Sequence, residues 1–190
     1  MTPEEEKKAR WREDTDQLYR AIGEFVVKFE HVTLALSLIA KAILERGGLE
    51  DEQVSNIILA GTTAEPLRSL VEALASQAAY LNSNDMEHFR SLLKRFQSLT
   101  AKRNDVVHGA WLVEWYNYAS NQDDYAIATG FKLHKNKDGA ATKQFSKEVA
   151  DFTRLTSEAE ALTTQFHKLL GKFIFDQTGN QLAFKRRDLE

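Results

Sequence analysis

The segment TAKRNDVVHGAW, residues 100–111, carries the side chains of this sequence best suited to chemistry. Asn104 and His108 are four residues apart, a spacing that places two side chains on one face of a helix. Arg103 points elsewhere, but its long side chain can curve around the helix. An imidazole transfers protons near neutral pH and a guanidinium binds anions, so two interpretations stand: a small catalytic group, or a polar helix end leaving the core.

A run of basic residues precedes this segment. Between Glu87 and Asp105 there is no acidic residue, although the net charge of the chain is −3. Either these residues form a solvated helix face, or they bind phosphate. The candidate substrate-binding residues are Lys94, Arg95 and Lys102.

Arg103 also continues the apolar stripe formed by Leu92, Phe96 and Leu99. Because an unpaired charge in a core is costly, an arginine here needs a partner, a groove or a second subunit. Glu30 is the candidate partner, since it stands beside Phe29 in the apolar part of the first helix. This ion pair would give Arg103 a purely structural role.

The composition is that of a globular protein: 190 residues, 43% hydrophobic and 28% charged, enough for one well-buried core. No apolar run is long enough to cross a bilayer, and the charged N-terminus lacks the apolar centre of a signal peptide. The absence of cysteine excludes thiolate metal sites and fits a cytoplasmic protein. We therefore expect no membrane association. The sequence contains neither a glycine-rich phosphate loop nor a metal-binding pair of histidines, so no metal or cofactor is expected.

Hydrophobic periodicity predicts a mainly α-helical fold, a bundle of four or five helices with a β-hairpin inserted before the last long helix. A long helix is expected over residues 11–46, stopped by Gly47 and Gly48, and a short one around 51–60. A third has Pro66 in its first turn and runs to about Leu81. Ser83 or Asn84 then caps the helix that carries the segment described above.

The pattern changes after residue 110. AWLVEWYNYA and YAIATGFKLHK predict a hairpin at about 111–135 with SNQDD as its loop. Residues 136–143 are expected to form a loop, and Ser146 to cap the final helix. The aromatic residues Trp111, Trp115, Tyr116 and Tyr118 can stack on bases, but in a short hairpin such clusters more often cover a core. The predicted organisation is a charged lead (1–14), one helical domain (15–175) and a tail (176–190).

The segment RNDVVH, residues 103–108, resembles the R-x4–6-H motif of HEPN domains, including the asparagine that often follows the arginine. These are small all-α domains of bacterial toxins, antiphage defence proteins and CRISPR-associated ribonucleases. The layout is similar too: a long first helix, a motif late in another long helix and a closing helix. The resemblance extends over roughly residues 15–173.

The resemblance implies a metal-independent endoribonuclease of a toxin–antitoxin or antiphage defence system, with Arg103 and His108 as catalytic residues supported by Asn104. Such cleavage needs a proton moved at the ribose 2′-OH or the leaving oxygen, and charge stabilisation at the phosphate, which suit imidazole and guanidinium. The resemblance further implies a homodimer whose composite site is built from two motifs, with RNA as substrate and an antitoxin or regulatory protein as partner.

Two alternatives remain open at this point. The chain is either a non-catalytic HEPN-like module that binds a nucleotide, an RNA or a protein, or a structural bundle with an accidental motif. His31, His88, His134 and His167 lack acidic neighbours at helical spacing, so we expect them to be structural or solvent-facing.

Overall fold

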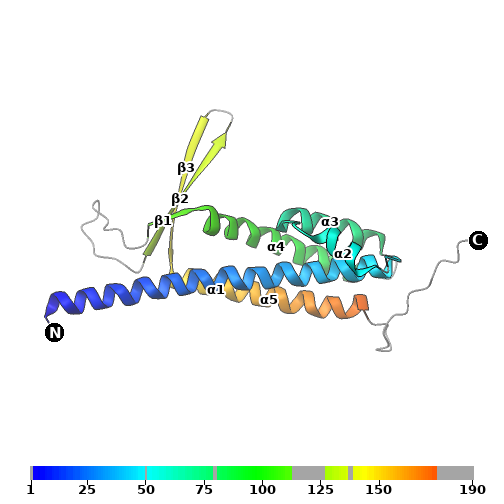
Figure 1. The fold of residues 1–190 in the computed structure, drawn as a ribbon, viewed down its shortest axis with the longest axis horizontal. Coiled ribbons are helices and arrows are strands. Elements are labelled where there is room, and N and C mark those ends of the chain that lie inside the picture. Colours follow the sequence, from blue (N-terminus) through cyan, green and yellow to red (C-terminus); the bar gives the residue numbers. More distant parts are fainter. Residues whose placement is uncertain (1, 50, 79–80, 113–126, 137–138, 175–190) are drawn as a thin grey trace, which may run out of the picture. The chain divides into compact units, whose positions relative to one another are not determined.

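The structure is a computed structural model of the 190-residue chain, and it describes residues 2–49, 51–78, 81–112, 127–136 and 139–174. These residues form mainly helices, with a small antiparallel sheet before the last long helix (Figure 1), which confirms the predicted fold class. The helices are α1 (Pro3–Arg46), α2 (Glu52–Leu59), α3 (Ala64–Gln77), α4 (Ser83–His108) and α5 (Val149–Ile174). The strands are β1 (Ala110–Leu112), β2 (Ile127–Asn136) and β3 (Gly139–Glu148).

The chain forms two compact units, each made of two separate segments. The first unit comprises residues 1–28 and 101–158, and the second comprises residues 29–100 and 159–190. None of the described helices combines the length and the apolar character that crossing a membrane requires.

The second unit has an aromatic core. Phe29 of α1 stacks on Phe96 of α4 with ring centroids 5.7 Å apart, and Phe96 meets the edge of Phe166 of α5 at 6.4 Å. Phe89 of α4 contacts Phe166 and Phe173 edge-on, both at 6.2 Å. All five rings are at most 2% exposed. Each buried ring contributes about 1.5–3 kcal/mol, so these contacts hold α1, α4 and α5 together in this unit.

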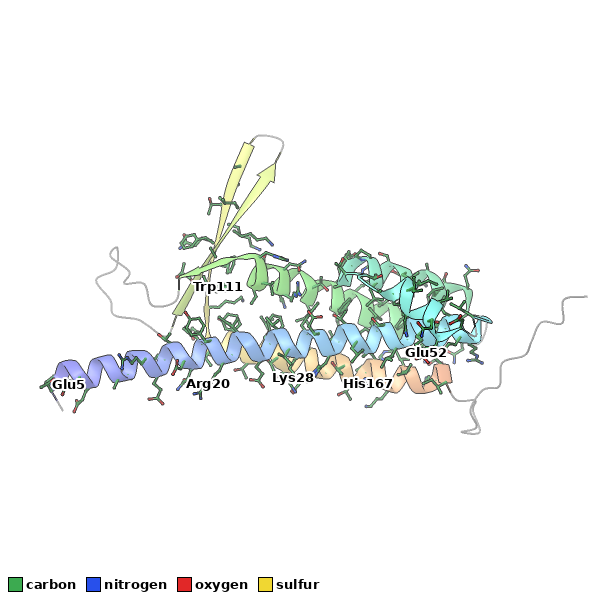
Figure 2. All side chains as sticks on the ribbon, in the orientation of Figure 1. Glu5, Arg20, Lys28, Glu52, Trp111 and His167 are labelled. Carbon is green, nitrogen blue, oxygen red and sulfur yellow. The ribbon has the colours of Figure 1, made fainter. Side chains whose placement is uncertain are left out.

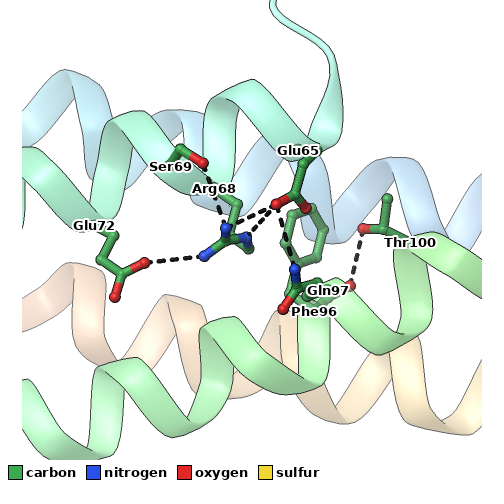
Figure 3. A network of polar contacts seen from close by, with 7 residues as sticks. All are labelled: Glu65, Arg68, Ser69, Glu72, Phe96, Gln97 and Thr100. Carbon is green, nitrogen blue, oxygen red and sulfur yellow. Dashed lines mark hydrogen bonds and ion pairs between the residues drawn. The ribbon is translucent and has the colours of Figure 1, made fainter.

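Helix α3 joins this core through Leu67, Val71 and Ala75, which are buried. Arg68 on the same helix donates hydrogen bonds to Glu65 and Glu72 at 2.7–2.9 Å (Figure 3). Gln97 of α4 donates from Nε2 to Oε1 of Glu65 at 3.4 Å, so this polar network also links α3 to α4.

Helix ends follow local rules, with one correction. The backbone N–H groups of Gly47 and Gly48 close the last turn of α1, and Gly48 has a φ of +101°, which favours glycine. The residue that caps α4 is Asn82, not Ser83 or Asn84 as predicted. Its Oδ1 accepts from the N–H of Asp85 at 2.8 Å, and its carbonyl accepts from Met86.

Two helices have bounds that differ from the prediction. Helix α1 begins at Pro3 instead of residue 11, because the charged lead is rich in Glu, Lys, Ala and Arg, which favour helix. Helix α3 ends at Gln77, short of Leu81. The predicted tail, residues 176–190, lies outside the described residues.

The sheet of the first unit has the order β1-β2-β3, with antiparallel pairing throughout. Pairing of β1 with β2 matches the predicted hairpin, although its loop SNQDD lies outside the described residues. The prediction of a loop over 136–143 and a cap at Ser146 is wrong, because β3 occupies residues 139–148. This strand is almost wholly exposed, so it lacks the apolar alternation that indicates a strand.

Helix α5 therefore begins at Val149. Its first turn is closed by Asp151, whose Oδ2 accepts from the backbone N–H of Glu148 at 3.0 Å. The buried residues that follow recur every three or four positions: Phe152, Leu155, Ala159, Leu162, Phe166, Leu169 and Phe173.

Candidate active site

The predicted catalytic residues lie in the last two turns of α4. Arg103 and Asn104 are half-buried, Val106 is buried and His108 is exposed. This order follows from helical periodicity, because Val106 faces the interior of the first unit while His108, two residues later, faces outward. The motif therefore has one apolar anchor and an accessible imidazole.

Arg103 bends toward Asn104. Its Nη1 donates a hydrogen bond to Oδ1 of Asn104 at 3.4 Å. Asn104 and His108 are four residues apart on the helix, so they share a face. That the arginine curves around the helix to this face stays a prediction.

The acidic residue within the motif is paired with two lysines. Oδ1 of Asp105 lies 3.2 Å from Nζ of Lys132 on β2, and Oδ2 lies 2.5 Å from Nζ of Lys143 on β3. Lys132 also donates to the backbone carbonyl of Asn104 at 3.3 Å. These contacts join the end of α4 to both long strands.

The same contacts control the charge at this point. Partial burial acts to raise the pKa of Asp105, but the hydrogen bonds from Lys143 and Lys132 outweigh burial, and the pKa lies below its ordinary 3.8. Asp105 is thus ionised at neutral pH and balanced by two cations.

An aromatic contact closes the end of α4. The indole N–H of Trp111 on β1, the residue labelled in Figure 2, donates to the carbonyl of Val106 at 2.6 Å. This satisfies one of the carbonyls left open at a helix end. The Trp111 ring meets Phe145 of β3 at 5.0 Å and Phe152 of α5 at 5.6 Å. The expectation that Trp111 covers a core is confirmed; Trp115, Tyr116 and Tyr118 lie outside the described residues.

Two glycines make room for the Phe145 ring. A Cβ at Gly109 would lie 2.5 Å from the carbonyl oxygen of Asp105 and 2.9 Å from Cζ of Phe145. A Cβ at Gly130 of β2 would overlap the same ring. The segment GAW that follows the motif therefore has a structural role. The chain turns at Gly109, where a side chain would not fit, and the Trp111 indole fixes the end of the helix.

Lys102, one residue before Arg103, borders a pocket of about 380 Å³ in the first unit. In this pocket Asp151 pairs with Arg154, and the hydrogen bond from the Glu148 N–H and the Arg154 pair lower the pKa of Asp151. The pocket is therefore polar and lined by charges of both signs. Its lining residues are Lys102, Lys147, Asp151, Arg154, Leu155 and Glu158.

The remaining candidates lie in the second unit. Lys94 is exposed and Arg95 is half-buried on α4, and Glu30 is exposed on α1. Their expected association with the motif, including the ion pair of Glu30 with Arg103, stays a prediction. His31, His88 and His167 are exposed, as expected, and His134 has a side chain outside the described set. Within the described part of the chain, no group of three His, Asp or Glu residues is placed to hold a metal ion.

No family model, no curated protein and no solved structure matches this chain. The HEPN interpretation therefore depends on the motif and its surroundings.

The roles of Asp105, Lys132, Lys143, Gly109, Gly130 and Phe145 were not predicted from the sequence. Asp105 lies inside the segment RNDVVH, but its partners are 27 and 38 residues later in the sequence, on two different strands. Only the strand register brings them together: Lys132 of β2 pairs directly with Lys143 of β3. Two lysines opposite each other on neighbouring strands repel, so once this register is known an acidic side chain is expected between them.

Proposed function

We propose that this protein is a metal-independent endoribonuclease acting as a bacterial toxin or antiphage defence effector in the cytoplasm. The observation that carries the proposal is the arrangement at the end of α4. The Arg103 guanidinium contacts the Asn104 side chain, and the exposed His108 imidazole follows one helical turn later. These groups supply a fixed positive charge, an amide and a proton-transfer group within a short stretch of one helix.

The chemistry is transesterification. The ribose 2′-oxygen attacks the adjacent phosphorus, the bond from phosphorus to the 5′-oxygen breaks, and a 2′,3′-cyclic phosphate forms. His108 takes the proton from the 2′-OH or gives one to the leaving 5′-oxygen. Arg103 stabilises the negative charge that develops on the phosphate oxygens, and Asn104 orients the guanidinium through their hydrogen bond.

The surroundings favour an anionic ligand. Lys102, Arg103, Lys132 and Lys143 are cations of the first unit, and Asp105, which two of them bind, is the acid of the motif. Among these five residues of the motif and its lysine partners, positive charges outnumber the negative one, whereas the whole chain has a net charge of −3. RNA is then held by a local surface of the first unit, with Lys102 as a further phosphate contact, and binding weakens as salt rises. That Lys94 and Arg95 of the second unit bind phosphate stays a prediction.

One motif contains a single proton-transfer group, whereas the reaction uses an acid and a base. We therefore propose that the active form is a homodimer in which two RNDVVH segments contribute to one composite site. Wild-type subunits mixed with excess His108→Ala subunits should lose activity more steeply than dilution alone predicts. A strictly proportional loss would indicate independent sites. An antitoxin or regulatory protein that covers this surface is the expected partner.

The test of the function is cleavage of single-stranded RNA by purified protein in excess chelator. We expect products that end in 2′,3′-cyclic phosphate or 3′-phosphate, because the 2′-oxygen is the nucleophile. Strict dependence on a divalent ion, or 3′-hydroxyl ends, would contradict the mechanism. RNA binding without any cleavage would identify the alternative, a non-catalytic HEPN-like module.

A further inference from the structure

Helix α1 carries a second stripe opposite the one that faces the core. Its core-facing residues are buried, among them Phe25, Phe29, Val32 and Ile39. The second stripe follows alternating steps of four and three residues, the spacing at which one helix packs against another. Its members are Arg20, Glu24, Val27, His31, Leu34, Leu38, Lys41 and Glu45.

The centre of this stripe is apolar and accessible. Val27 is 55% exposed, Leu34 58% and Leu38 38%. Large apolar side chains scattered singly on a surface are ordinary, but three at helix-packing spacing on one face indicate a contact surface. The stripe lies wholly on α1, from residue 20 to residue 45, a length of about 38 Å at 1.5 Å per residue.

The order of side chains along the stripe is self-complementary. If two copies of α1 lie antiparallel, with the two-fold axis between residues 32 and 33, each residue meets the one equally far on the other side of that point. Val27 then lies opposite Leu38 of the other copy, and His31 opposite Leu34. Glu24 meets Lys41, and Arg20 meets Glu45.

This charge order distinguishes a second copy from other partners. In a parallel pairing, Glu24 would face Glu24 and Lys41 would face Lys41, and such like-charge contacts are unfavourable. The antiparallel pairing turns every flanking position into an opposite-charge contact. The basic and acidic residues lie outside the apolar centre, as in interfaces with an apolar core and a polar rim.

Part of the rim is already ordered within one chain. Nζ of Lys41 lies 2.5 Å from Oε1 of Glu52 and 3.9 Å from Oε1 of Glu45. The hydrogen bond with Glu52 raises the pKa of Lys41, so this lysine is charged at neutral pH. Two of the four flanking residues are therefore held in position before association, which lowers the entropy lost on binding.

We propose that α1 pairs antiparallel with α1 of a second copy of this chain, through Val27, His31, Leu34 and Leu38. The pairing is inferred from one exposed face of α1, and it does not require that the protein cleaves RNA. It names a surface that holds two copies together, separate from the motif at the end of α4.

Cysteine cross-linking tests the register directly, because the chain contains no cysteine. Val27 and Leu38 are 11 residues apart, about 16 Å along a helix, too far for a disulfide within one chain or between two copies of the same residue. In the proposed pairing, Val27 of one copy adjoins Leu38 of the other. Mild oxidation should link Val27→Cys chains to Leu38→Cys chains in a mixture, and neither variant to itself.

Either variant cross-linking to itself as readily as in the mixture would overturn the antiparallel register. A mixture that does not cross-link would overturn the pairing whatever the mass of the wild-type protein, because a dimer formed through the RNDVVH segments alone does not bring Val27 and Leu38 together. Both readouts measure association, so the RNA assay does not affect their interpretation.

A substitution with a matched control tests the apolar centre. Leu34→Glu places a charge opposite His31 and beside Leu38, and we expect the dimer dissociation constant to rise at least about tenfold. Ile57→Glu changes a 71% exposed residue of α2 in the same way and should leave the mass unchanged. Circular dichroism checks that both variants keep their helices. An undiminished Val27–Leu38 cross-link when Leu34→Glu is added to both cysteine variants would contradict the proposal.

Discussion

Helix α4 is held by different means in the two units of the molecule. In the second unit, Phe89 and Phe96 lie among the rings of Phe29, Phe166 and Phe173, and all of them are buried. In the first unit, the end of the same helix is held mainly by single directed contacts: two lysines on Asp105 and the Trp111 indole on the Val106 carbonyl.

The difference bears on where the proposed site lies. A packed apolar core excludes water and offers no polar group to a substrate. A helix end fixed by hydrogen bonds keeps Arg103 and Asn104 half-buried and leaves His108 exposed, while its backbone position is still defined. The first unit is therefore suited to a reactive site, and the second unit provides stability.

The largest expected effect is in the aromatic core. Phe96→Ala removes a ring that stacks on Phe29 at 5.7 Å and contacts Phe166 at 6.4 Å. We expect a loss of about 3–5 kcal/mol in the free energy of unfolding, since a cavity is left in a buried position. Chemical denaturation measures it. A loss below about 1 kcal/mol would show that this core is not the main source of stability.

A smaller, local effect is expected at the end of α4. Gly109→Ala places a Cβ against the Asp105 carbonyl and the Phe145 ring, and should cost about 1–3 kcal/mol through overpacking. Hydrogen exchange should show faster opening of β2, β3 and the last turn of α4, with the second unit unchanged.

Gly171→Ala is the matched control, because a Cβ at this position in α5 meets nothing within 4 Å. It should stabilise the protein by about 0.5–1 kcal/mol, the usual gain of alanine over glycine in a helix. If both glycine variants were equally tolerated, the close packing of Phe145 on Gly109 would not be a constraint.

The smallest effect is electrostatic. Asp105→Asn removes the charge that binds Lys132 and Lys143, and should cost about 1 kcal/mol at pH 7, a low value because Lys143 is 50% exposed and screened by solvent. The lowered pKa of Asp105 means that its contribution is complete above the ordinary value of 3.8 and is lost as the pH falls through the lower folded-state pKa. The stability difference between wild type and variant should therefore be constant near neutrality and shrink in acid below 3.8.

Asp16→Asn, at an exposed position of α1, is the control and should change stability little at any pH. A wild-type advantage over Asp105→Asn that persisted undiminished in strong acid would contradict the two lysine contacts.

The same comparison explains what the sequence predicts. Periodic apolar residues indicate a helix through helix geometry alone, so the long helices α1 and α5 were predicted from the sequence. Strand β3 was not predicted, because Phe145 is its main apolar residue and its partner is identified only by register. The contact of Arg103 with Asn104 was not predicted, and the lysines that bind Asp105 are distant in sequence and could not be assigned.

The central claim is that the end of α4 performs chemistry, and two histidines of that helix test it directly. His88 and His108 are both exposed on α4. We predict that His108→Ala lowers the rate of RNA cleavage in chelator at least about a hundredfold, the usual contribution of a general acid or base, with the unfolding free energy unchanged within about 0.5 kcal/mol. His88→Ala should keep both values. Cleavage by His108→Ala at the wild-type rate, or a loss of cleavage that is matched by unfolding, would contradict the account.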